Sequence, residues 1–133
     1  MTACYLDASA LVKLATPESE TDALRAYCSE YDDRLTSRLA TVEVTRALYR
    51  RGLDSALLVD AVGEAFGGLA ILEVDPTVAD AAGRVEPPML RSLDAIHLAS
   101  ALALRGELGA LITYDTRLAD AARAAGLEVV APA

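Results

Sequence analysis

Short apolar runs alternate along the chain with longer segments in which apolar residues recur at the spacing of an amphipathic helix. The short runs predict strands at 3–6, 34–36, 70–74, 110–113 and 128–130. The longer segments predict helices at 9–15, 18–31, 39–51, 55–66, 77–85, 94–104 and 116–125. This alternation predicts an α/β fold, in which a mostly parallel central sheet is flanked by helices on both faces.

Length and composition indicate one globular domain. The chain has 133 residues, which suits a single domain with its own core, and 53% of them are hydrophobic. No internal repeat, proline-rich linker or low-complexity segment divides it. We therefore expect residues 1–133 to fold as one unit.

The apolar runs are too short for a membrane protein. None approaches the roughly 18 residues that cross a bilayer, so we expect no membrane span. Asp7 interrupts the first run and no basic leader precedes it, which is untypical of a secretory signal and predicts a cytoplasmic protein. Cys4 and Cys28 are expected to be buried thiols, although their spacing alone leaves a disulfide open.

Four acidic residues fall near one edge of the expected sheet. Asp7 ends the first strand, Asp115 follows the fourth, Asp94 opens a long helix and Glu43 lies one turn inside another. In parallel sheets, sites lie beyond the carboxyl ends of the strands. Clustered carboxylates repel each other unless a cation compensates them. Oxygen ligands without His or Cys indicate Mg²⁺ or Mn²⁺, and a phosphate ester is the natural substrate of such a site.

Each acidic residue also has a purely structural interpretation. An Asp at the start of a helix commonly caps it by accepting a backbone N–H, which suits Asp7, Asp94 and Asp115. Only this capping role is expected for Asp22, Asp54 and Asp75. Glu43 lies at the edge of an apolar helix face, where an ion pair with Arg46 or Arg50 would satisfy it.

Two hydroxyl side chains are candidates for supporting this cluster. Ser9 follows Asp7 by two residues, and Thr113 precedes Asp115 by two. Their hydroxyls either orient the carboxylates and metal-bound water or simply cap the backbone.

Four motifs carry the acidic residues in order along the chain. They are YLDASALVKL at 5–14, TVEV at 41–44, LDAIHLA at 93–99 and TYDTRL at 113–118. Each motif alone is weak, but the ordered set resembles that of PIN-domain nucleases, and specifically of the VapC toxins of bacterial toxin–antitoxin pairs. The resemblance implies a PIN-like fold over residues 1–133. It also implies that Asp7, Glu43, Asp94 and Asp115 are catalytic and bind Mg²⁺ or Mn²⁺.

The resemblance further implies an activity and partners. The activity is endonucleolytic hydrolysis of single-stranded or loop RNA, such as tRNA or ribosomal RNA, by a metal-activated water. The partners are a small VapB-type antitoxin that occupies the active-site groove and a second copy of the toxin, in a homodimer that forms a heterotetramer or larger assembly with antitoxin. All four acidic positions are retained, so the motifs do not indicate an inactive member.

Two other classes of protein remain as alternatives. A non-catalytic PIN module would bind RNA or antitoxin without cleavage, and the four carboxylates argue against it. A phosphoryl-accepting receiver-like domain also has acidic strand ends and Mg²⁺. It requires paired acidic residues after the first strand and a Lys after the last, whereas Asp7 is single and the only Lys is Lys13.

The net charge is unusual for a protein that binds RNA. Twelve Lys and Arg against 20 Asp and Glu give −8, which argues against capture of RNA by a broad basic surface. Four arginines in or beside one expected helix are candidates for local contact with the RNA backbone, or are simply solvated: Arg38, Arg46, Arg50 and Arg51. His97, three residues after Asp94, is either a general acid or, more simply, a packed helix residue.

Overall fold

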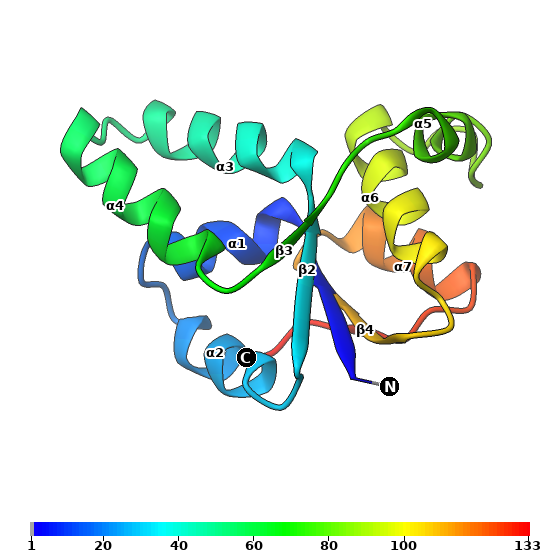
Figure 1. The fold of residues 1–133 in the computed structure, drawn as a ribbon, viewed down its shortest axis with the longest axis horizontal. Coiled ribbons are helices and arrows are strands. Elements are labelled where there is room, and N and C mark those ends of the chain that lie inside the picture. Colours follow the sequence, from blue (N-terminus) through cyan, green and yellow to red (C-terminus); the bar gives the residue numbers. More distant parts are fainter. Residues whose placement is uncertain (1) are drawn as a thin grey trace.

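Five parallel strands form one sheet in the computed structural model, which describes residues 2–133 (Figure 1). They are β1 (Ala3–Leu6), β2 (Asp33–Ser37), β3 (Ala70–Leu72), β4 (Leu108–Ile112) and β5 (Val129–Val130). Their order across the sheet is β3-β2-β1-β4-β5, and every neighbouring pair is parallel. The predicted α/β fold with a parallel sheet is therefore confirmed.

Within residues 2–133, seven helices connect these strands. They are α1 (Ala8–Ala15), α2 (Thr21–Cys28), α3 (Arg38–Arg50), α4 (Ser55–Phe66), α5 (Pro76–Ala82), α6 (Ser92–Ala103) and α7 (Thr116–Ala124). Figure 1 shows α1, α3 and α4 on one side of the sheet and α5, α6 and α7 on the other. Each predicted helix is present, and most bounds differ by one to three residues.

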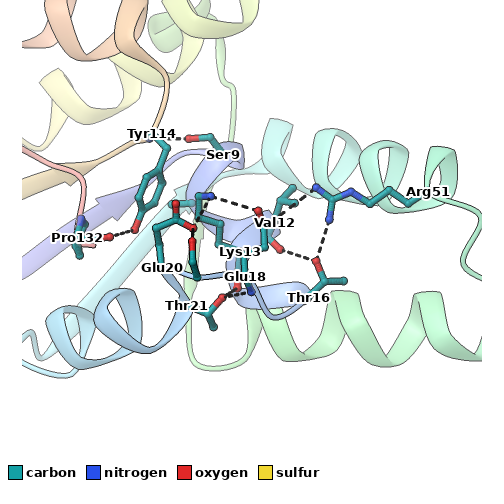
Figure 2. Close-up of polar contacts among 12 residues, drawn as sticks. Ser9, Val12, Lys13, Thr16, Glu18, Glu20, Thr21, Arg51, Tyr114 and Pro132 are labelled. Carbon is teal, nitrogen blue, oxygen red and sulfur yellow. Dashed lines mark hydrogen bonds and ion pairs between the residues drawn. The ribbon is translucent and has the colours of Figure 1, made fainter.

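The turn between α1 and α2 explains why the second helix begins three residues later than predicted. Thr21 is 3% exposed, and its hydroxyl donates to the Lys13 carbonyl (2.7 Å) and accepts from the Glu18 N–H (2.8 Å). Figure 2 shows this turn, with the Lys13 amine reaching Glu18 and Glu20. These bonds hold residues 18–20 in a turn, so the helix begins only at Thr21.

The central strand β1 contributes to the core on both faces of the sheet, and all four of its residues are buried. Cys4 and Leu6 pack on the side of α1 and α3. Tyr5 points to the opposite side, where Leu98 of α6 and Leu118 of α7 surround it. Alternation along a strand produces this division, and it leaves Asp7 just beyond the carboxyl end of β1.

The connections place three strand ends beside each other. β1 pairs with β2 on one side and β4 on the other, and the Asp7 N–H donates to the Ile112 carbonyl (3.2 Å) at the end of β4. The helices between β1 and β3 cover one face, and those between β3 and β5 cover the other (Figure 1). Such a change of face at neighbouring strands is where α/β sheets form binding sites.

Two further expectations concern the described residues. Both cysteines are free and buried, as predicted. Among residues 2–133, no helix combines the length and the apolar content needed to traverse a bilayer.

Candidate active site

Asp7 is a buried carboxylate at the end of the central strand. Its side chain accepts hydrogen bonds from the Ser9 hydroxyl (2.6 Å), the Thr113 hydroxyl (2.5 Å) and the Ala10 N–H (3.1 Å), the last as the cap of α1. Burial raises the pKa of the Asp7 carboxyl, and the bonds from Ser9 and Thr113 act in the opposite direction. Because both carboxylate oxygens accept a bond, the orientation of Asp7 is fixed.

The turn after β4 is bound to the same group. The Thr113 hydroxyl accepts from the Asp115 N–H (3.0 Å), and the Ser9 hydroxyl accepts from the Tyr114 N–H (2.9 Å). Asp115 caps α7 by accepting from the N–H groups of residues 117 and 118, and both of these bonds go to Oδ1. Ser9 and Thr113 thus link the Asp7 carboxylate to the backbone beside Asp115.

Asp94 does not cap its helix. Helix α6 begins at Ser92 with Arg91 as its cap residue, so Asp94 lies in the first turn, and the interpretation of Asp94 as a cap is wrong. Burial raises the pKa of the Asp94 carboxyl, and the charges of Asp115, Asp7 and Glu43 raise it further. The four acidic residues therefore lie close enough for Asp94 to experience the charge of the other three.

Glu43 turns toward the other helical layer. Its Oε1 lies 2.6 Å from His97 Nε2 on α6, so the expected ion pair with Arg46 or Arg50 is wrong. His97 is 1% exposed, which confirms it as a packed helix residue. Its contact with Glu43 was not predicted, although its position one turn after Asp94 on α6 was a signal that it lies near the site.

Of the three capping predictions for residues outside the cluster, two are confirmed and one is wrong. Asp54 and Asp75 cap α4 and α5 through the N–H groups of Leu57 and Val78, as predicted. Asp22 lies inside the first turn of α2, so its predicted capping role is wrong.

The donor set suits a hard divalent cation. Mg²⁺ prefers oxygen ligands, commonly uses one or two carboxylates and retains several waters. Across residues 2–133, no three His, Cys, Asp or Glu side chains come together closely enough to enclose an ion by themselves. A cation at this edge would therefore contact few of the carboxylates directly and reach the rest through water, which is compatible with Mg²⁺.

A groove of about 1010 Å³ lies elsewhere, between α6, α7 and the loop before α6. Its walls are largely apolar, with Val85, Leu98 and Leu102 among them, and none of the four acidic residues lines it. Chemistry rather than concavity thus identifies the candidate site.

The side chains of Asp7, Glu43, Asp94 and Asp115 form the acidic edge at the carboxyl ends of the strands. The fold and this acidic edge define an α/β nuclease of the PIN type, and comparison with known proteins agrees. A family model described as PIN domain matches residues 4–124. The chain is 50% identical to Ribonuclease VapC46 of Mycobacterium tuberculosis over 132 residues, with 99% of each chain covered. It is 42% identical to Ribonuclease VapC35 of the same species, with 96% of each covered. The chain therefore belongs to the PIN-domain family, and within it to the VapC ribonucleases.

Solved structures share the fold at low identity. The M. tuberculosis VapC20 structure, described as a Sarcin-Ricin loop cleaving toxin, has a TM-score of 0.70 at 18% identity and covers 97% of this chain and 99% of its own. VapBC2 from Rickettsia felis, bound to a DNA fragment from its promoter, has a TM-score of 0.76 at 11% identity, with 98% and 99% covered.

The raised pKa of Asp94 predicts a stability effect that depends on pH. Replacing Asp94 by Asn is expected to raise the Tm of the metal-free protein at pH 7, because a negative charge at this half-buried position beside other negative charges is unfavourable. A carboxyl whose pKa is raised by folding contributes stability below its unfolded pKa of about 3.9 and loses it as the pH rises through the folded pKa.

Thermal unfolding in EDTA checks this prediction. The Tm difference between Asp94→Asn and wild type is expected to grow as the pH rises from about 4 to 7. Asp60→Asn, at an exposed position of α4, is the control and is expected to show no such trend. A lower Tm for Asp94→Asn than for wild type at pH 7 would contradict the prediction.

Proposed function

We propose that this VapC ribonuclease is a metal-dependent endoribonuclease whose Mg²⁺ or Mn²⁺ is held by Asp7, Glu43, Asp94 and Asp115. The observation that carries the proposal is a set of hydrogen bonds: Thr113 joins Asp7 to the backbone of Asp115, and Glu43 contacts His97, one turn after Asp94. These contacts bring four carboxylates from four different segments to the carboxyl edge of the sheet. Their mutual repulsion is the condition that a divalent cation relieves.

The four acidic residues have different parts in the proposed site because their surroundings differ. A bound cation lowers the pKa of a water and offsets charge on the phosphate. Asp7, locked by Ser9 and Thr113, supplies a ligand of fixed orientation. Burial raises the pKa of the Asp7 and Asp94 carboxyls, and a bound cation would act in the opposite direction by offsetting their negative charge.

The proposed substrate is single-stranded or loop RNA, of the tRNA or ribosomal RNA class. The description of VapC20, a relative in fold, as a Sarcin-Ricin loop cleaving toxin supports a loop substrate. Direct attack by water leaves the 2′-hydroxyl of the RNA unused, so the products should carry 5′-phosphate and 3′-hydroxyl ends.

Cleavage of total cellular RNA by the purified, antitoxin-free protein tests the proposal. Discrete cuts are expected with Mg²⁺ or Mn²⁺ and none with EDTA. Asp7→Asn, which retains a good helix cap, should reduce the cleavage rate by about a hundredfold or more, because it removes a catalytic charge.

Asp75→Asn is the matched control, since Asp75 caps α5 through the same kind of bond, and it should cleave normally. Cyclic phosphate ends would reject attack by water. Absence of cleavage with either metal, in protein that is folded and binds RNA, would instead favour the non-catalytic PIN module.

Two arginines on α3 are the proposed contacts to the RNA backbone. The other two candidate arginines already have side-chain partners. Arg38 pairs with Glu73 (2.9 Å), and Arg51 donates to the Thr16 hydroxyl (2.9 Å; Figure 2). Arg46 and Arg50 are exposed and form no ion pair within residues 2–133. They follow Glu43 by three and seven residues, so they continue the same strip of the helix surface.

The double variant Arg46→Ala/Arg50→Ala is expected to bind RNA more weakly. The slope of log affinity against log salt should fall by roughly 0.7 for each phosphate contact that is lost from single-stranded RNA. Fluorescence anisotropy in an Asp7→Asn background measures both quantities without cleavage.

Arg84→Ala is the control and should leave both quantities unchanged. Arg84 is exposed, lies just beyond the end of α5 and pairs with Asp80 of that helix. Unchanged affinity and salt slope in the double variant would remove α3 from the RNA interface.

A VapB-type antitoxin and a second copy of the chain are the proposed protein partners. The solved structure of the same fold described as VapBC2 supports the antitoxin partner. Large apolar side chains are exposed on α3 and α4, which supports an additional interface: Val42, Tyr49, Leu57 and Val59. The apolar run at 98–104 is a poorer candidate for the dimer face, because Leu98 is fully buried in the core.

Light scattering of the isolated protein is expected to give a mass near twice the 13.9 kDa of one chain. Addition of antitoxin should raise the mass to that of a heterotetramer or a larger assembly. A monomer at micromolar concentration would contradict the homodimer.

A further inference from the structure

Three side chains from three elements form a continuous hydrogen-bonded unit, here named the His97 bridge: Tyr5 of β1, His97 of α6 and Glu43 of α3. The Tyr5 hydroxyl lies 2.7 Å from His97 Nδ1, and His97 Nε2 lies 2.6 Å from Glu43 Oε1. Tyr5 is 0% and His97 1% exposed, and their rings meet edge to face. The bridge joins helices that lie on opposite sides of the sheet (Figure 1).

The hydrogen-bond chemistry of the bridge selects one arrangement of protons. A carboxylate only accepts hydrogen bonds, so His97 Nε2 must carry the proton that it shares with Glu43. The Tyr5 hydroxyl then donates to His97 Nδ1, and burial, which raises the pKa of Tyr5, keeps that hydroxyl protonated. With both nitrogens bonded, the imidazole cannot rotate without losing a buried hydrogen bond.

Without this histidine, Glu43 has other partners. Arg46 lies one turn further along α3, at the spacing that favours an ion pair, and it is exposed and unpaired among the described residues. A Glu43 side chain that turned along its own helix would leave the acidic edge. The position of Glu43 therefore depends on a competition between a buried imidazole on α6, bonded at both nitrogens, and an exposed guanidinium on α3.

We propose that His97, held in place by Tyr5, is a positioning residue that directs Glu43 to the acidic edge and away from Arg46. The inference rests on the proposed function, because it assigns His97 a role through one of the proposed metal ligands. Asp94, one turn before His97 on α6, shares the side of the helix to which Glu43 is drawn.

A double-mutant cycle on kcat tests the proposal. His97→Leu is expected to lower kcat by roughly 10- to 100-fold, the usual cost of losing a residue that orients a ligand, with a much smaller change in KM. In a Glu43→Gln background, the same substitution should have no further effect on kcat. A merely structural role would lower kcat by the same factor in both backgrounds, and that result would overturn the proposal.

Conservative variants give a second comparison. His97→Gln keeps an N–H donor toward Glu43 and should recover part of the activity that His97→Leu loses. Tyr5→Phe removes only the hydroxyl and should lower kcat in the same sense, so it carries the test if His97→Leu fails to fold by circular dichroism. Wild-type kcat in both Tyr5→Phe and His97→Leu would refute the inference.

Thr21→Val is the control for general destabilisation. It removes the two hydrogen bonds of the buried Thr21 hydroxyl at the end of α1 opposite Asp7 (Figure 2). We expect it to lower Tm while leaving kcat unchanged. A loss of kcat in Thr21→Val equal to that in His97→Leu would mean that lower stability alone explains the effect.

Two readouts do not depend on RNA cleavage. His97 is the only histidine, so its ring nitrogens are assigned directly by nitrogen NMR, and the tautomer protonated at Nε2 is expected. Calorimetry with Mg²⁺ should give a roughly tenfold or greater loss of affinity in His97→Leu, and a similar loss in Glu43→Gln.

These readouts separate the two proposals. A tautomer protonated at Nδ1 overturns the role of His97 whether or not the protein cleaves RNA. If wild type neither binds Mg²⁺ nor cleaves RNA, the proposed function fails. If wild type does both and Glu43→Gln is impaired in both, normal behaviour of His97→Leu refutes the His97 inference alone.

Discussion

The buried carboxylate of Asp7 is the constraint on which the surrounding structure depends. At 3% exposure it cannot rely on water, and an unpartnered buried carboxylate would be strongly destabilising. Its partners come from α1 and from the turn after β4, so β4 must lie directly beside β1. The hydroxyl of Thr113 then holds the backbone of Asp115, so that the position of one acidic residue determines that of the next.

The acidic edge places stability and chemistry in opposition. Burial and like charges raise the pKa of Asp94, and a protein selected only for stability would place a neutral group there. The fold keeps the repulsion tolerable by anchoring three of the four carboxylates: Asp7 and Asp115 cap helix starts, and Glu43 contacts an imidazole. Asp94 has no such anchor within residues 2–133, so its substitution reports most directly on the repulsion.

Local periodicity was sufficient to predict the fold, and long-range contacts explain what it missed. Each strand and helix follows from its own apolar spacing, and the ordered motifs brought the four acidic residues to one edge. The partner of Glu43 could not be predicted from local spacing. Arg46 and His97 both lie within reach, and only the packing of α6 against the sheet decides between them. The capping roles expected for Asp22 and Asp94 are wrong because the turns before the two helices set where the helices begin. Thr21 closes the turn before α2, and Arg91 is the residue that precedes α6.

The position of β1 in the middle of the sheet has a consequence for the order of events during synthesis. The first strand made receives its second neighbour only when β4 appears, and the bond between Thr113 and Asp7 spans 106 positions in the sequence. Contacts of this kind form late, because a long loop must close before they can be made. A chain still emerging from the ribosome therefore lacks the complete acidic edge until the segment that carries Thr113 and Asp115 is free to pack beside β1.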